Sequence, residues 1–323
     1  MDLTRPDSSV LQLAVDLACR APSLHNSQPW RWKYVDGQLQ LLGDHTRLLP
    51  ATDPTGRQLH ISCGAALHHL SVGLLGLRWS ADIRYEERAV SPNLLATISF
   101  RRDARPRSHD FDMLTAIRRR RTDRRAFGVF EGIDALVERA VDQARELGVS
   151  VVAFDQLQRE GLLEATESTA SARRYDPEYQ AELHWWAGHS LATGGIPETS
   201  LVSGVAGVPI GRTFPSRQNA PPEESGSVDE STVLAFGTPT DTRTDWLHCG
   251  RALSTVLLEA TVRGAATCPL SHVTEVPRSR SVIHRIVPEI GVPQMLLRIG
   301  RAPSGTPPVL TARRSVSDVF STS

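Results

Sequence analysis

One short sequence pattern occurs twice in this chain, each time near the start of a long apolar helix. Residues 63–67 read C-G-A-A-L and residues 249–253 read C-G-R-A-L, an offset of 249 − 63 = 186 positions. The two predicted helices, at residues 58–77 and 246–262, are rich in small residues, which allow helices to pack closely. Self-similarity on this scale predicts two fused copies of one domain.

The order of the other predicted elements supports this interpretation. A helix followed by a strand at residues 11–35 recurs in the same order at residues 136–154. So short a match alone could also come from two unrelated packed helices. We predict an α+β chain of two halves, residues 1–110 and 111–323, that imitates a C2 dimer. The chain would then be a pseudo-dimeric monomer, or a homodimer if exposed surfaces also pair.

Composition excludes several functional classes. The 36 basic and 36 acidic residues give a formal net charge of +0, so no global basic field predicts nucleic acid or an acidic membrane as a partner. No apolar run approaches the roughly 18 residues of a membrane span, and the N-terminus has no signal-peptide core. The four cysteines show no C-x-x-C spacing, and the histidines at 60, 68 and 69 have no acidic partners, so we expect no metal. These features predict a reduced, cytoplasmic protein.

A rigid polar loop follows the first predicted helix. Residues 21–30 read A-P-S-L-H-N-S-Q-P-W and precede a predicted β-hairpin at residues 30–42. Ser23, Asn26 and Gln28 can donate and accept hydrogen bonds, and Pro29 stiffens the loop. Such a loop suits a flat, heteroatom-rich ligand. The alternative is a helix stop with an Asx-type turn.

An arginine cluster follows another predicted helix, near Met113. Residues 120–124 read R-R-T-D-R, and guanidinium forks match phosphate oxygens two at a time. The alternative is a solvated basic helix end, and Arg118, Arg119 and Arg125 are predicted to be solvated. The first half has the polar loop but no such cluster. The second half has the cluster, whereas its counterpart loop, E-L-G-V at 146–149, has no polar array. Two half-sites could therefore form one complete site.

In order and wording, these motifs resemble the nitroreductase family of FMN-dependent NAD(P)H oxidoreductases, and most closely its Acg-like actinobacterial branch. A-P-S-x-x-N-x-Q-P-W is similar to the family's flavin-contacting loop, and R-R-T-D-R to its R-R-S-x-R motif. Residues 264–272 resemble a turn along the isoalloxazine, and residues 313–319 resemble its C-terminal R-R-P-L-x-E-V segment. Ser315 replaces the usual proline, so the register of the tail is open by one residue, and a loose basic tail is the alternative.

The resemblance implies one FMN at the junction of two nitroreductase-like halves. The residues implied at the phosphate are Arg120, Thr122, Arg124, Arg313 and Arg314. Ser23, Asn26 and Gln28 would contact the ring or ribityl chain from the other half, with Pro269, Leu270 and Ser271 near N5. The backbone N–H of His272 is a candidate for the same contact, and its side chain could act as an acid, although a surface histidine is the commoner case. Cys268 is expected to be packed rather than reactive.

As an enzyme, such a protein would take hydride from NAD(P)H and reduce a small-molecule acceptor such as a nitro compound or quinone. The predicted loop at 209–231 and the aromatic residues of a helical stretch at 157–195 could cover the flavin as a lid. If they do so permanently, the chain is a non-catalytic FMN-binding or sequestering protein. A structural protein without flavin would leave the two half-sites unexplained.

Overall fold

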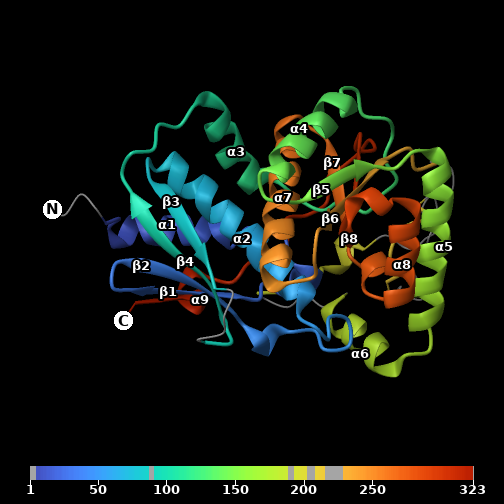
Figure 1. Cartoon of the computed structure of the whole chain (residues 1–323), viewed down its shortest axis with the longest axis horizontal. Helices are drawn as coiled ribbons and strands as arrows, with labels where there is room; N and C mark the ends of the chain where they lie inside the picture. The colour runs from blue at the N-terminus through green and yellow to red at the C-terminus, as the bar shows by residue number, and fades with distance from the viewer. Residues whose placement is uncertain (1–4, 87–90, 188–192, 202–207, 215–227, 323) are drawn as a thin grey trace.

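Two mixed helix-and-sheet lobes lie on either side of two long central helices in the computed structural model (Figure 1). The structure describes residues 5–86, 91–187, 193–201, 208–214 and 228–322. The central helices are α2 (Arg57–Gly76) and α7 (Arg243–Val262). Their bounds lie within a few residues of the two predicted apolar helices, and the α+β prediction is confirmed.

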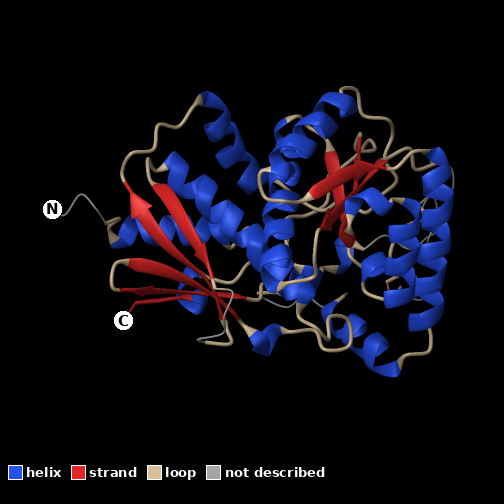
Figure 2. Ribbon diagram, in the orientation of Figure 1, coloured by secondary structure: helices blue, strands red, loops and turns tan. Residues whose placement is uncertain are grey.

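The first lobe contains a five-stranded sheet with the strand order β3-β4-β2-β1-β9 (Figure 2). The hairpin prediction is confirmed, since β1 and β2 pair antiparallel. Its elements are α1 (Ser8–Ala18), β1 (Trp30–Val35), β2 (Gln38–Gly43), β3 (Ser80–Tyr85), β4 (Leu94–Arg101) and β9 (Phe320–Thr322).

The second lobe contains a four-stranded antiparallel sheet with the order β5-β6-β8-β7. Its elements are α4 (Ile133–Arg145), β5 (Ser150–Ala153), β6 (Thr232–Thr238), β7 (Ala266–Leu270) and β8 (Val292–Gly300). Residues 264–272 were predicted as a turn, and this is wrong in part. Gly264, with φ 82°, ends α7, and the residues after it form β7, paired with β8.

The two sheets have the same topology. Reading β5, β6, β7 and β8 as the counterparts of β1, β2, β3 and β4 turns one strand order into the other. Both sheets also carry a register shift at the equivalent pairing, between Leu41 and Leu42 on β2 and between Phe236 and Gly237 on β6. Two unrelated halves would share neither feature, so the topology supports an internal duplication.

The central helices touch through a reciprocal glycine contact. A Cβ built on Gly64 would lie 2.1 Å from the carbonyl oxygen of Leu247, and one built on Gly250 would lie 1.9 Å from that of Ile61. The offset of 186 relates Gly64 to Gly250 and Ile61 to Leu247. The contact of Gly64 with Leu247 is therefore repeated by their counterparts, Gly250 and Ile61. The crossing thus has the isologous form of a two-fold interface.

The hydrophobic cores follow the same exchange. Leu247, from α7, is buried in the core of the first lobe together with Trp30 and Trp32, and Ile61, from α2, is buried in the core of the second with Phe236. His60 packs edge-on against its own counterpart, Trp246, with ring centroids 5.3 Å apart. The halves therefore share their cores rather than merely abutting.

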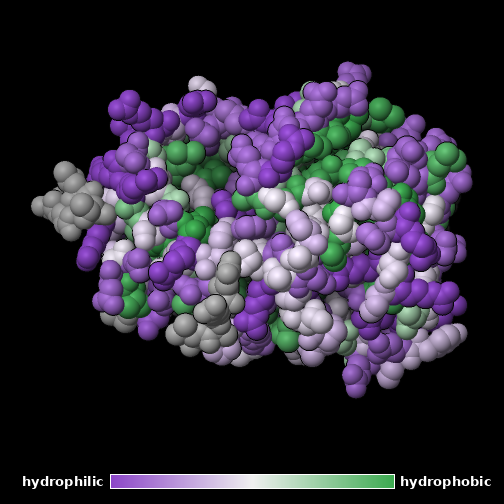
Figure 3. Space-filling view, in the orientation of Figure 1, coloured by the Kyte–Doolittle hydropathy of each residue, from purple (hydrophilic) through white to green (hydrophobic). Residues whose placement is uncertain are grey.

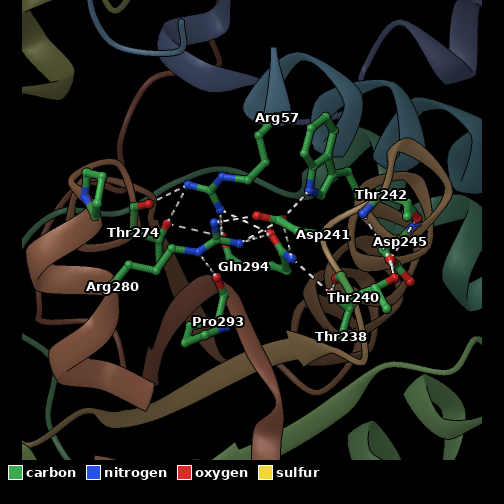
Figure 4. A network of polar contacts seen from close by, with 12 residues as sticks. Arg57, Thr238, Thr240, Asp241, Thr242, Asp245, Thr274, Arg280, Pro293 and Gln294 are labelled. Carbon is green, nitrogen blue, oxygen red and sulfur yellow. Dashed lines mark hydrogen bonds and ion pairs between the residues drawn. The ribbon is translucent and has the colours of Figure 1, made fainter. Parts of the chain in front are cut away.

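A polar network joins the start of α2 to the second lobe (Figure 4). Arg57 donates hydrogen bonds of 2.6 Å to the backbone carbonyls of Gln294 and Thr274. Arg280 forms a bidentate ion pair with Asp241, at 2.7 and 2.8 Å, and Gln294 donates to Asp241 at 3.0 Å. This network fixes the first turns of α2 against β8.

The chain tail crosses back to the first lobe, where β9 pairs in parallel with β1 (Figure 1). The last residues of the predicted second half thus lie on the first sheet. The remaining helices are α3 (Ser108–Arg119), α5 (Gln156–Arg173), α6 (Pro177–Trp186), α8 (Pro277–Ile286) and α9 (Val316–Val319). Short 3-10 turns occupy Leu24–Asn26, His45–Arg47, Glu198–Ser200, His272–Thr274 and Pro288–Ile290.

Helices α5 and α6 fill most of the stretch predicted as helical at 157–195, of which residues 188–192 lie outside the described residues. Among the described residues, no helix is long and apolar enough to cross a membrane. Hydrophilic side chains cover most of the face in Figure 3, and apolar side chains show in separate patches between them.

Candidate functional site

Two adjoining cavities lie where the two halves meet. Cavity A holds about 1100 Å³ of empty space, including its open mouth, and cavity B about 690 Å³. Pro22, Ser23, His25, Thr122 and Arg124 line both, so the cavities share a wall built from the polar loop and the arginine motif. The structure therefore brings the two predicted half-sites together.

Cavity B is strongly basic. Six arginines line it, and none of its described lining residues is acidic. They are Arg20, Arg118, Arg120, Arg121, Arg124 and Arg313. Four come from the end of α3 and the residues after it, and Arg313 comes from the tail that returns to the first lobe.

Arg120 is the most unusual of these residues. It is 5% exposed, and its Nε and Nη1 have no hydrogen-bond partner among the described residues. Burial, and then the charge of Arg121, lowers the pKa of Arg120 to about 10. Burial, and then Arg120 and Arg20, lowers the pKa of Arg313 to about 9. An anion bound beside these two buried cations would offset both their burial and their mutual repulsion.

The other arginines of the motif have separate partners. Arg124 donates to the carbonyl of Ser200 at 3.1 Å and lies over the ring of Phe214, 5.3 Å from its centroid. Arg125, predicted to be solvated, instead forms a bidentate ion pair with the buried Asp123, at 2.6 and 3.0 Å. Asp123 thus ties down a neighbouring arginine and leaves cavity B free of carboxylates among its described lining residues.

The polar loop has an unusual backbone. His25, Asn26 and Gln28 have φ values of 48°, 58° and 50°, in the left-handed region that non-glycine residues seldom adopt. Asn26 holds this shape by donating to the carbonyls of Gly195 and Ala312, at 3.1 and 3.0 Å. Strain of this kind, held by surrounding contacts, is typical of functional sites.

Gln28 was predicted at the flavin, but the structure gives it a different role. It is 0% exposed and lines neither cavity. Its Nε2 donates to the carbonyl of Thr193 at 2.7 Å, and its Oε1 accepts from the backbone N–H of Arg314 at 2.8 Å. Gln28 therefore fixes the tail against the loop, because its amide is already fully used within the protein.

The C-terminal arginines differ in the same way. Arg313 lines cavity B and donates to Oδ1 of Asn26 at 3.0 Å. Arg314 lines neither cavity and instead pairs with the buried Asp44 at 3.3 Å. Of these two arginines, only Arg313 lines a cavity, and Arg314 anchors the tail. The tail is accordingly not loose.

Cavity A is lined largely by apolar groups from both halves. Pro269, Leu270 and Ser271, at the end of β7, line one side together with Cys268. Ile61 and Ala65 of α2, Leu253 of α7 and Met295 of β8 complete much of the remaining wall. Burial raises the pKa of the Cys268 thiol, which agrees with a packed rather than reactive cysteine.

A segment of the predicted lid also lines cavity A. Val208, Gly211, Arg212 and Phe214 lie there, whereas residues 215–227 of that loop fall outside the described residues. Arg212 donates to Tyr179 on α6, to Glu275, and to Oγ of Ser271 at 3.0 Å. These bonds hold the segment against the end of β7.

Comparison with known proteins identifies the family of this chain. It is 40% identical over 324 residues to a Mycobacterium tuberculosis protein named "Putative NAD(P)H nitroreductase acg", covering 98% of this chain and 97% of that one. The chain belongs to the nitroreductase family, in its Acg-like branch. A second M. tuberculosis nitroreductase of this kind, Rv3131, is 35% identical over 318 residues, with 97% and 92% of the two chains covered.

Solved nitroreductases are more distant. One from Anabaena variabilis matches with a TM-score of 0.48 at 10% identity, covering 92% of this chain and 74% of that one. One from Bacteroides fragilis, with bound FMN, matches with a TM-score of 0.37 at 15% identity, covering 61% and 94%. No protein-family model matches the chain.

Several residues of the site were not singled out from the sequence. His25, Gln58, Arg212 and Arg298 line cavity A. Arg298 is 1% exposed and ion-paired with the equally buried Asp229, at the end of the predicted lid. His272, predicted as a surface residue, is buried in the same wall. Only tertiary contacts distinguish these residues, since none belongs to a local pattern of phosphate or ring binding.

Proposed function

We propose that this protein is an FMN-dependent oxidoreductase that takes hydride from NAD(P)H and reduces a nitro compound, a quinone or a similar small acceptor. The observation that carries the proposal is the buried Arg120, which has no counter-ion among the described residues, in a basic cavity that adjoins a largely apolar one. A phosphate dianion fits the basic cavity B, and a flat aromatic ring fits the largely apolar cavity A. The names of the relatives support the same activity.

The residues present fit this cofactor. Arg120 and Arg313 would hold the phosphate, with Arg20 and Arg124 beside it and the Thr122 hydroxyl at the junction of the cavities. Charge-assisted hydrogen bonds of this kind are roughly twice as strong as neutral ones. Pro269 to Ser271 would lie along the ring. When bound, the flavin supplies the hydride-accepting centre, so the chain needs no strong catalytic acid of its own.

A specific observation favours the second candidate, a flavin that is bound but covered. Arg212, whose side chain is 8% exposed, joins the lid segment to α6 and to the end of β7 through three hydrogen-bonding partners. If this segment covers the ring permanently, the nicotinamide has no access to it. The cavity would then serve to bind and sequester the cofactor.

One experiment separates the two functions. The purified protein, loaded with FMN, is followed by visible absorption under anaerobic conditions after addition of NADPH and then NADH. We expect the flavin bands to bleach within seconds. Flavin that stays oxidised with both donors would support sequestration, and a protein that retains no FMN would refute both functions.

A further inference from the structure

The side chain of Asn26 joins three segments of the chain at cavity B. It is buried, and the residue lines the cavity. Its Nδ2 donates to the carbonyls of Gly195 and Ala312, at 3.1 and 3.0 Å, and its Oδ1 accepts from Nη1 of Arg313 at 3.0 Å. Both hydrogens of the carboxamide are therefore used within the protein, so its nitrogen has no donor left for a ligand.

Arg313 is the cation that this carboxamide holds, and its described partners are all uncharged. Besides Oδ1 of Asn26, it donates to the hydroxyl of Thr311 and to the backbone carbonyls of Thr311, Ala312 and Arg20. No carboxylate pairs with it among the described residues. Arg313 is thus held in one place by several hydrogen bonds while its positive charge stays uncompensated within the protein.

A carboxamide meets two requirements here that a carboxylate of the same shape cannot meet. An ionised carboxylate has no hydrogen to donate to the carbonyls of Gly195 and Ala312. It would also compensate the charge of Arg313, and a compensated cation attracts a phosphate less strongly. The backbone does not account for asparagine at this position, because asparagine and aspartate both tolerate the left-handed conformation that Asn26 adopts, with φ 58°.

We propose that Asn26 is a positioning residue for phosphate binding. Its neutral oxygen holds Arg313 at cavity B, and its nitrogen ties the polar loop to the tail and to residues 193–201. This inference rests on the proposed function and moves Asn26 from the flavin itself, where the family resemblance implied it, to Arg313. Because Asn26 acts through Arg313, changing it should weaken a flavin that carries a phosphate and spare one that does not.

The test compares FMN with riboflavin, which has no phosphate, by fluorescence titration of the apo form of the full-length protein. Asn26→Asp keeps the shape of the side chain but places a carboxylate against Arg313. It should weaken FMN by about 10- to 100-fold and leave riboflavin nearly unchanged. Asn93→Asp makes the same change at an exposed position and should affect neither flavin. Equal losses of FMN and riboflavin in Asn26→Asp would place Asn26 at the ring and overturn the inference.

A double-mutant cycle with FMN alone separates positioning from a general loss of structure. Asn26→Gly suits the left-handed backbone and releases Arg313, so it should weaken FMN by about 3- to 10-fold. In an Arg313→Gln background the same change should add no further loss, because the residue that Asn26 positions is gone. Additive losses, or no loss from Asn26→Gly alone, would overturn the inference and leave the proposed function intact. A natural chain that binds no FMN would overturn both.

Discussion

The wall of cavity A and the position related to it by the 186-residue offset, called the second cleft below, are lined by side chains of opposite size. Ser62 and Ala65 of α2 and Ser271 after β7 line cavity A. Adding 186 to Ser62 and Ala65 gives His248 and Arg251, and subtracting 186 from Ser271 gives Tyr85.

In the second cleft these larger side chains contact one another. The rings of Tyr85 and His248 meet edge-on, with centroids 4.6 Å apart, and Arg251 donates to the Tyr85 hydroxyl. A histidine, an arginine and a tyrosine therefore occupy the positions that two serines and an alanine leave open in the first cleft.

The comparison shows how one of two equivalent positions can be filled while the fold is kept. Both sheets and both central helices keep their topology, because the shared cores require them. The positions equivalent to the wall of cavity A are free of that constraint in the first lobe, and large side chains fill them. One complete cleft then depends on both halves of one chain.

Replacing Gly250 by alanine should have the largest effect, because the crossing of the central helices forms both clefts. The new Cβ would lie 1.9 Å from the Ile61 carbonyl oxygen, a backbone atom that cannot move alone. We expect the free energy of unfolding, measured with urea, to fall by about 3 kcal/mol.

Gly76→Ala, in α2, is the matched control for this substitution. Its new Cβ would meet only the end of the Leu114 side chain, at 2.9 Å, which can rotate away. Equal losses for Gly250→Ala and Gly76→Ala would contradict the close crossing.

Arg120→Ala should have the second-largest effect, and it distinguishes the two clefts chemically. The substitution removes a buried cation that only the open cleft possesses, so FMN affinity should fall by roughly 1.5–3 kcal/mol, or about 10- to 150-fold. Arg119→Ala, one residue earlier and exposed, should change the dissociation constant by less than about twofold. Similar losses in both variants, measured by fluorescence titration, would show that the phosphate does not lie at Arg120.

Acidification should weaken the joint that both clefts share. Burial lowers the pKa of His60 to about 4, and its ring packs on Trp246. Because the folded pKa lies below the unfolded value of about 6.5, this stability is complete above pH 6.5 and is lost as the pH falls toward 4. Between pH 7 and pH 5 the loss from His60 should be about 2 kcal/mol. His60→Gln should reduce the drop in unfolding free energy by that amount, and an unchanged drop would contradict this assignment.

Tyr85→Ser should have the smallest effect. It opens space in the closed cleft and removes the contacts with His248 and Arg251, at a cost of about 1 kcal/mol in unfolding free energy. It should not create a second flavin site, because no arginine motif precedes the first half. A second equivalent of bound FMN in this variant would show that bulk alone closes the second cleft.

The sequence was sufficient for the parts of the site that lie in short local motifs. The residues of R-R-T-D-R that line cavity B were singled out because several guanidinium donors in one run suit a phosphate. Arg313 was singled out only because its segment resembles the C-terminal motif of the family. The helix pair was found because its repeated small residues follow directly from close packing. The matching strand orders then supported the duplication.

Side-chain direction could not be read from spacing. Gln28 and Arg314 lie in the right motifs, yet they bind each other and Asp44 rather than facing a cavity. His25, Gln58 and His272 meet only after three distant segments have folded together. Residues 264–272 fit both a turn and a short edge strand, and pairing with β8 decided the outcome.

The most direct test of the account is the number of flavins bound per chain. Apo protein at a known concentration is titrated with FMN, and bound flavin is counted by absorbance after gel filtration. We predict one FMN per chain, held in the cleft that Arg120 lines. Two per chain would contradict the closure of the second cleft by Tyr85, His248 and Arg251, and none would contradict the assembly of one site from two half-sites.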